Sequence, residues 1–103
     1  MVDLPPVQYD HPFQGELQIV EVADQAAIHR ACFPYLGAYA CSRIVDNGVK
    51  RVGMIHILPL RLMWVNEPAE TKKRYYNCLI RHEVGHLNGA PADHSGDWRP
   101  CKP

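Results

Sequence analysis

The sequence predicts one small α+β domain in which a short antiparallel or mixed sheet packs on a long C-terminal helix, with one shorter helix beside them. The chain has 103 residues, so we expect a single domain over 1–103. Apolar and polar residues alternate over 16–22 and again over 49–60, which indicates strands. Apolar residues recur at helical intervals over 67–87, which indicates a long helix.

The first segment, 1–15, contains three prolines and a glycine: Pro5, Pro6, Pro12 and Gly15. We expect it to be an extended arm that lies on the domain or is partly disordered. After the strand at 16–22, a short helix is predicted over 25–32. Asp24 is a suitable N-cap for this helix, and Pro34 ends it.

A hairpin is predicted in the middle of the chain, with strands at 35–45 and 49–60. The turn Asp46-Asn47-Gly48 favours a type I′ geometry, because Asn and Gly tolerate positive φ. Pro59 ends the second strand. His56 in this strand has two interpretations: a group that polarises a substrate carbonyl beside a metal, or a buried histidine with a structural hydrogen bond.

The long helix is predicted from about 67 to 87. Asn66 is expected to cap it and Pro68 to occupy its first turn. Its apolar stripe, which we expect to pack under the sheet, consists of Tyr76, Leu79, Ile80, Val84 and Leu87. Gly85 costs about 1 kcal/mol relative to alanine inside a helix. We interpret Gly85 as permitting a close backbone approach to the metal loop or to the sheet.

The motif that carries the chemistry is His82-Glu83-Val84-Gly85-His86, an H-E-x-x-H pattern. Residues four apart share one face of a helix, so His82 and His86 can present two nitrogen atoms to one metal ion. Glu83 lies beside the first histidine, where its carboxylate can reach a water on that metal. This combination is typical of zinc hydrolases.

A catalytic zinc usually has three protein ligands. Gly89 suits the end of the helix, and Pro91 prevents the helix from continuing. The chain must therefore turn just before Asp93 and His94. We predict His94 as the third ligand, with Asp93 as the alternative. If His94 binds, Asp93 can instead orient a ligand imidazole.

At these residues the chain resembles the zincin metallopeptidases, and within them the metzincin-like pattern H-E-x-x-H-x-x-G. His82, Glu83, His86 and Gly89 match it in place. The usual third-ligand position is Ala92 here, so the third ligand would be displaced. No methionine follows the motif, so the Met-turn is missing, and no glutamate follows Glu83. The resemblance covers about the last quarter of the chain and implies a minimal zincin-like domain. It also implies that one strand pairs with extended substrate.

Four cysteines in a small chain favour disulfides if the protein is exported. We favour the pairs Cys32–Cys41 and Cys78–Cys101, with four free thiols or one structural zinc site as alternatives. An exported or periplasmic location is slightly favoured over the cytoplasm. The first six residues lack the pattern of a signal peptide, and a signal that has been removed stays open. The tail is expected to pack near the site through Trp98, with Asp97 as a second carboxylate there.

Charge and hydropathy exclude several kinds of partner. The formal net charge is zero, so a nucleic acid or an anionic membrane is not an expected partner. No apolar run approaches the roughly 20 residues of a membrane span. The basic run 72–74 is interpreted as a solvated helix face. We expect a monomer that acts on a peptide or protein substrate.

Two functions are therefore expected from the sequence. The first is a zinc metallopeptidase, in which Zn²⁺ is held by His82, His86 and His94 and Glu83 assists the attack of zinc-bound water on a peptide bond. The alternative is a binding module on the same scaffold, stabilised by zinc and with little or no catalysis. The small size favours this alternative, whereas the glutamate beside the first ligand argues against it.

Overall fold

A computed structural model describes residues 2–35 and 37–101 and has an α+β fold. The elements in chain order are β1 (Asp3–Leu4), the 3-10 helix η1 (Val7–Tyr9), β2 (Glu16–Glu21), α1 (Gln25–Cys32), β3 (Ala40–Asp46), β4 (Arg51–Ile57), the 3-10 helix η2 (Leu60–Leu62), α2 (Ala69–Leu87) and β5 (Arg99–Pro100). The predicted α+β class, with one long helix, one short helix and short sheets, is confirmed. Neither helix of the described residues is long and apolar enough to cross a membrane.

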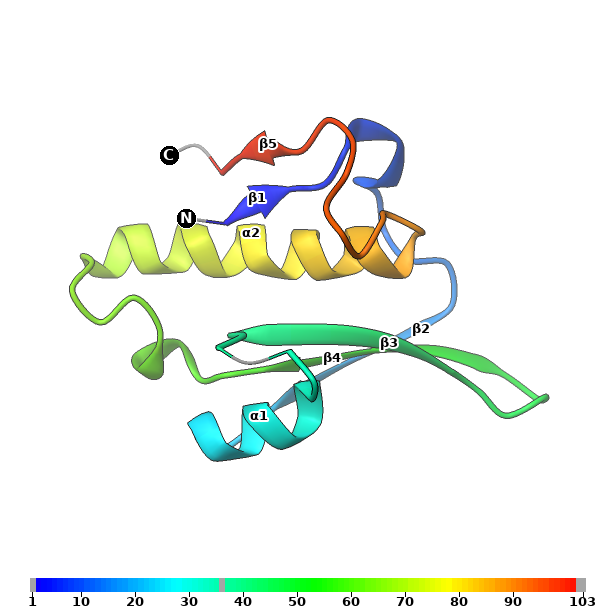
Figure 1. Ribbon diagram of the computed structural model, residues 1–103, viewed down its shortest axis with the longest axis horizontal. Helices are drawn as coiled ribbons and strands as arrows, with labels where there is room; N and C mark the ends of the chain where they lie inside the picture. The colour runs from blue at the N-terminus through cyan, green and yellow to red at the C-terminus, as the bar shows by residue number, and fades with distance from the viewer. Residues whose placement is uncertain (1, 36, 102–103) are drawn as a thin grey trace.

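The elements form four layers (Figure 1). α1 covers one face of a three-stranded sheet, and α2 covers the other face. A two-stranded ribbon of β1 and β5 lies on the far side of α2. The sheet has the order β2-β4-β3, with β2 parallel and β3 antiparallel to β4, so it is mixed as expected. α2 is consequently enclosed between the sheet and the two ends of the chain.

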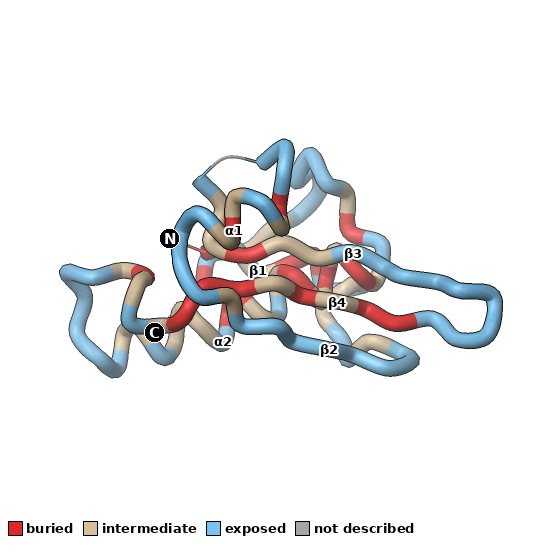
Figure 2. The backbone as a smooth tube through the Cα atoms, turned by 90° about the horizontal axis from the view of Figure 1, so that it is seen from below, coloured by how far each residue is buried: buried red, intermediate tan, exposed pale blue. Residues whose placement is uncertain are grey.

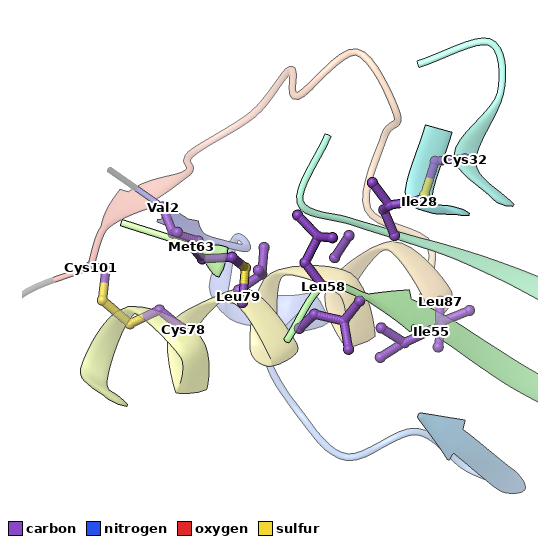
Figure 3. Packing of buried hydrophobic residues seen from close by; sticks show 12 residues of the cluster. Val2, Ile28, Cys32, Ile55, Leu58, Met63, Cys78, Leu79, Leu87 and Cys101 are labelled. Carbon is purple, nitrogen blue, oxygen red and sulfur yellow. A yellow bond between two sulfur atoms is a disulfide. The ribbon is translucent and has the colours of Figure 1, made fainter. Parts of the chain in front are cut away.

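The core forms where β4 meets the helices. β4 is largely buried, whereas β2 and the outer part of the β3–β4 hairpin are exposed (Figure 2). Ile55 and Ile57 are fully buried and belong to one cluster with Ile28 of α1 and with Leu79 and Leu87 of α2 (Figure 3). α1 and α2 each turn an apolar face toward the sheet, whereas β4 is covered on both faces, so its neighbouring residues Val52 and Gly53 are both buried.

The N-terminal arm lies on α2 as an ordered part of the domain. Its backbone pairs with the tail, since Asp3 is opposite Pro100 and Leu4 is opposite Arg99. Arg99 Nη2 donates to the Pro5 carbonyl at 2.8 Å. Pro5 packs directly on Gly85, where an added Cβ would lie 2.4 Å from the Pro5 Cβ. Gly85 does permit a close approach, but the predicted partner was wrong: the arm lies there instead of the metal loop or the sheet.

Both predicted disulfides are present. Cys32 of α1 is bonded to Cys41 of β3, and Cys78 of α2 is bonded to Cys101 just after β5. The first bond joins the short helix to the sheet, and the second joins the tail to the long helix. All four cysteines are therefore in disulfides, which suits an oxidising environment.

The hairpin turn differs from the prediction. A type I′ turn needs positive φ at both Asn47 and Gly48, but Trp64 and His94 are the non-glycine residues with positive φ in the described chain. Asn47 Oδ1 instead accepts hydrogen bonds from the backbone of Val49 and Lys50. The type I′ prediction was wrong because this side chain stabilises a longer loop.

Several element boundaries also differ. The second hairpin strand, predicted over 49–60, spans Arg51–Ile57. The first hairpin strand begins at Ala40 instead of residue 35. α2 begins at Ala69, and Pro68 occupies the N-cap position that we assigned to Asn66. Asn66 lies in a preceding turn, in which Glu67 N donates to the Trp64 carbonyl at 2.9 Å. Within α2, Cys78, Leu79 and Leu87 are buried, whereas Tyr76, Ile80 and Val84 are only partly so.

Candidate metal centre

Three histidines converge at the C-terminal end of α2. His82 and His86 lie one turn apart on the helix, and His94 comes from the loop that follows it. Each pair of Nε2 atoms is separated by 3.2 Å. Tetrahedral zinc with Zn–N bonds of about 2.0–2.1 Å requires nitrogen atoms about 3.3 Å apart. The three nitrogens therefore have the spacing of a tetrahedral zinc site.

The other nitrogen of each helical histidine is held by a backbone carbonyl. His82 Nδ1 lies 2.6 Å from the Asp3 carbonyl, and His86 Nδ1 lies 3.1 Å from the Ala90 carbonyl. A carbonyl oxygen can only accept, so both Nδ1 atoms must donate. In neutral imidazoles the Nε2 atoms then carry lone pairs.

These two lone pairs face each other at 3.2 Å. Without a cation or a proton between them they would repel, whereas a metal ion would accept both. Burial lowers the pKa of His82, and the neighbouring His86 and His94 lower it further, against the effect of the Asp3 carbonyl. A lowered pKa favours the neutral imidazole that a metal requires. The donor set consequently fits a metal ion.

Local backbone rules explain how the loop leaves the helix. Gly89 has φ +112°, Gly89 N donates to the His86 carbonyl at 3.1 Å, and Ala90 N donates to the Gly85 carbonyl at 2.9 Å. This is the Schellman pattern that ends many helices at a left-handed glycine. It also places the Ala90 carbonyl next to His86. The helix end predicted at Gly89 is confirmed.

The loop then presents His94 and leaves Asp93 outside the cluster. His94 N donates to the Pro91 carbonyl at 3.0 Å, and His94 has φ +61°, which is uncommon for a residue with a side chain. Asp93 Oδ1 accepts from Ser95 N at 3.0 Å and so stabilises the turn. Of the two candidate third ligands, His94 is the one that the structure brings to the other histidines.

Glu83 lies on the sheet side of α2, with only 6% of its surface exposed. Burial raises the pKa of its carboxyl, while a side-chain hydrogen bond from Ser42 and the charge of His86 oppose this shift. Glu83 lines a cavity of about 460 Å³ together with all three histidines. Glu83 and the three histidines therefore line the same space.

The cavity extends from the histidines along β3. Much of its wall is apolar and made of small side chains: Ala38, Ala40, Ala90 and Ala92. Ser42 and Arg43 of β3 supply polar groups in the same wall. The space is large enough for a small ligand or a few residues of a chain, and it leads directly to Glu83.

The indole of Trp98 lies against all three histidines. Its ring centroid lies 4.8 Å from that of His82, 5.2 Å from that of His86 and 4.9 Å from that of His94. The expectation that it packs near the site is confirmed. Asp97, expected beside it, is exposed. Sequence reasoning also missed the Asp3 carbonyl, because backbone groups leave no signal in a motif.

His56 does not reach this site. It lies in register with Cys41, which is bonded to Cys32 of α1, so it faces the α1 side of the sheet. His56 is not among the described residues that line the cavity. Burial lowers the pKa of His56, and the charge of Arg43 adds to this effect. Its position does not support a role beside the metal, and the buried, hydrogen-bonded alternative does not hold either, because His56 is only half-buried and makes no side-chain hydrogen bond within the described chain.

Comparison with known protein families, with curated proteins and with solved structures gives no match. The resemblance to the zincins therefore depends on the sequence motif alone.

Proposed function

We propose that the protein is a zinc-dependent hydrolase of the zincin type that cleaves peptide bonds. His82, His86 and His94 would hold Zn²⁺. The observation that carries the proposal is the convergence of three Nε2 atoms, two of them with lone pairs directed by carbonyls, beside a buried carboxyl in one cavity. A structural zinc site does not need such a carboxyl, and it is usually closed by four protein ligands.

Each group of the site would have a separate role in the reaction. Zinc bound here would lower the pKa of a coordinated water and polarise a carbonyl. A Glu83 carboxylate oxygen accepts the proton that a water must lose during attack, and later returns a proton to the leaving amine. The Asp3 and Ala90 carbonyls keep the two helical imidazoles oriented.

A peptide substrate would bind along β3. In the sheet order β2-β4-β3, β3 is an edge strand, and in the described residues its partner is β4 alone. Five consecutive residues of β3 line the cavity: Ala40, Cys41, Ser42, Arg43 and Ile44. An extended peptide can add to such an edge through backbone hydrogen bonds. This strand addition would direct a peptide bond toward Glu83 and the histidines.

The first test is the metal content of protein purified without a metal-affinity tag, measured by elemental mass spectrometry. We expect about one zinc per chain. Glu83→Gln should keep the zinc and reduce peptide hydrolysis by about 10²–10⁴-fold, the usual contribution of a general base. If neither protein binds zinc even when it is supplied, the zincin proposal is wrong.

The same variant distinguishes the proposed enzyme from the zinc-stabilised binding module. In the module, Glu83→Gln would retain zinc and no hydrolysis would be found in either protein across a broad set of peptides. The two disulfides favour an exported or periplasmic setting for either function.

A further inference from the structure

The indole of Trp98 lies against all three histidines at almost equal distances. The three ring centroids are 4.8, 5.2 and 4.9 Å from that of Trp98, and the imidazole centroids are 4.9, 5.1 and 4.9 Å from one another. A ring that is equally far from three converging rings must lie near their common axis. Trp98 therefore covers one of the two sides of the histidine cluster.

The cavity identifies which side is covered. His82, His86 and His94 line the cavity together with Glu83, and Trp98 is not among the described residues that form its wall. The indole consequently lies on the opposite side of the cluster. A metal ion at the three Nε2 atoms would have the indole behind it and the cavity in front.

We propose that Trp98 is a positioning residue of the metal centre. It closes the outer side of the cluster and holds His94 against the two helical histidines, so that the free coordination position faces Glu83. An indole offers no ligand to zinc and excludes water, so the centre keeps one open direction. This inference depends on the metal binding proposed above. It explains why a metal held by the three histidines would keep one free coordination position.

Trp98 is itself held in place by the tail. Trp98 Nε1 donates to the Ser95 carbonyl at 3.0 Å, and its own N–H donates to the Gly96 carbonyl at 3.1 Å. The next residue, Arg99, pairs with β1. The segment that carries Trp98 thus pairs with β1 directly after this residue, and the side chain of Trp98 is half-buried, whereas that of His94 is exposed. The indole of Trp98 can therefore restrict the position of the more exposed His94 imidazole.

Cobalt substitution tests this arrangement with the full-length protein. Metal-free wild type, Trp98→Phe and Trp98→Ala would be titrated with Co²⁺ while the visible absorption spectrum is recorded. We expect the intense spectrum of four-coordinate cobalt in wild type and in Trp98→Phe. Trp98→Ala should give the weaker spectrum of a higher coordination number, with metal affinity reduced by about 10–100-fold. An unchanged spectrum and affinity in Trp98→Ala would overturn the proposal and leave the metal site itself intact.

A second measurement does not depend on the folding of Trp98→Ala. Trp64→Phe leaves Trp98 as the sole tryptophan, and Trp64 packs against Tyr39 and Tyr75 rather than the histidines. Stoichiometric Co²⁺ should quench most of the fluorescence of this variant, because the indole lies within contact of the ligands. Cobalt that binds without quenching would overturn the placement of Trp98. A wild-type protein that binds no Co²⁺ or Zn²⁺ would instead overturn the proposed function, and this inference with it.

Discussion

The imidazole of His82 takes its orientation from a carbonyl 79 residues away in the sequence, that of Asp3. His86 takes its orientation from Ala90, only four residues away. The third imidazole, His94, depends on a turn with positive φ. At the scale of single residues, the site therefore combines one local constraint, one distant constraint and one strained turn.

Replacement of His94 should show whether its imidazole or its turn is essential. We expect His94→Ala to weaken zinc binding by more than the 10–100-fold that is typical of groups outside the ligand shell. His94→Gly should lose zinc to a similar extent, although glycine accepts φ +61° without strain. Competition with a chromophoric chelator measures both affinities.

Asp93→Ala is the matched control, because Asp93 stabilises the same turn through Ser95 but lies outside the cluster. It should weaken zinc binding far less than His94→Ala. The reverse order would identify Asp93 as the third ligand.

At the scale of elements, α2 lies between the sheet and the β1–β5 ribbon (Figure 1). Its sheet side carries Glu83 and Leu87, and its other side receives the N-terminal arm, with Pro5 on Gly85. The arm is also held by Asp10, which accepts hydrogen bonds from Arg81 of α2 and Arg99 of β5. These contacts place the Asp3 carbonyl beside His82. The arm is therefore a structural part of the site.

Gly85→Ala should destabilise the fold, although alanine is the better helix former by about 1 kcal/mol. The new methyl group would lie 2.4 Å from the Pro5 Cβ and would displace the arm. We expect a loss of about 1–3 kcal/mol in the free energy of unfolding, the usual effect of overpacking. Urea denaturation would measure it. Asn77→Ala, at an exposed position of the same helix, is the control and should not destabilise the protein; an equal loss in both variants would contradict the explanation.

Asp10→Asn should destabilise the protein in a pH-dependent way. The hydrogen bond from Arg81 lowers the pKa of Asp10 below its usual 3.8, with help from Arg99 and against the effect of burial. Because the folded state favours the ionised carboxylate, its contribution is present above pH 3.8 and is lost as the pH falls through the lowered pKa. We expect a loss of about 1–3 kcal/mol near neutral pH and a decreasing difference from wild type in acid.

Urea denaturation of metal-free protein at neutral and at acidic pH would measure this difference. Glu16→Gln is the control, since the Glu16–Lys50 pair is solvent-exposed and should contribute little. A difference between Asp10→Asn and wild type that stays constant down to strongly acidic pH would show that charge is not its origin.

At the scale of the whole molecule, the two disulfides join different layers. Cys32–Cys41 joins α1 to the sheet, and neither cysteine belongs to the histidine cluster. Cys78–Cys101 joins the tail, which carries Trp98, to the helix that carries His82 and His86. The second disulfide therefore links the tail to the helix of the histidine cluster.

Removal of each disulfide by paired Cys→Ser changes should separate these effects. The bonds span 9 and 23 residues of sequence, for which loop entropy suggests about 2.7 and about 3.4 kcal/mol of stabilisation. Cys78→Ser with Cys101→Ser should also weaken zinc binding, whereas Cys32→Ser with Cys41→Ser should leave it nearly unchanged. Calorimetric melting and zinc competition would give both values. Equal losses of zinc affinity in the two variants would show that the tail has no special link to the site.

The sequence by itself determined the features that local physics controls. The short helix has the predicted bounds because Asp24 Oδ1 accepts from Ala27 N, three residues on. The spacing of His82 and His86 follows from the helical period, and the end of α2 follows from Gly89. The sequence also favoured His94 over Asp93 and placed Trp98 near the site, and the structure brings both to the cluster. The type I′ prediction failed for a local reason, because the hydrogen bonds that Asn47 Oδ1 accepts from Val49 and Lys50 outweighed its tolerance of positive φ. Only the tertiary structure decided the partner of Gly85 and the carbonyl that holds His82, because each depends on chain segments that meet only after folding.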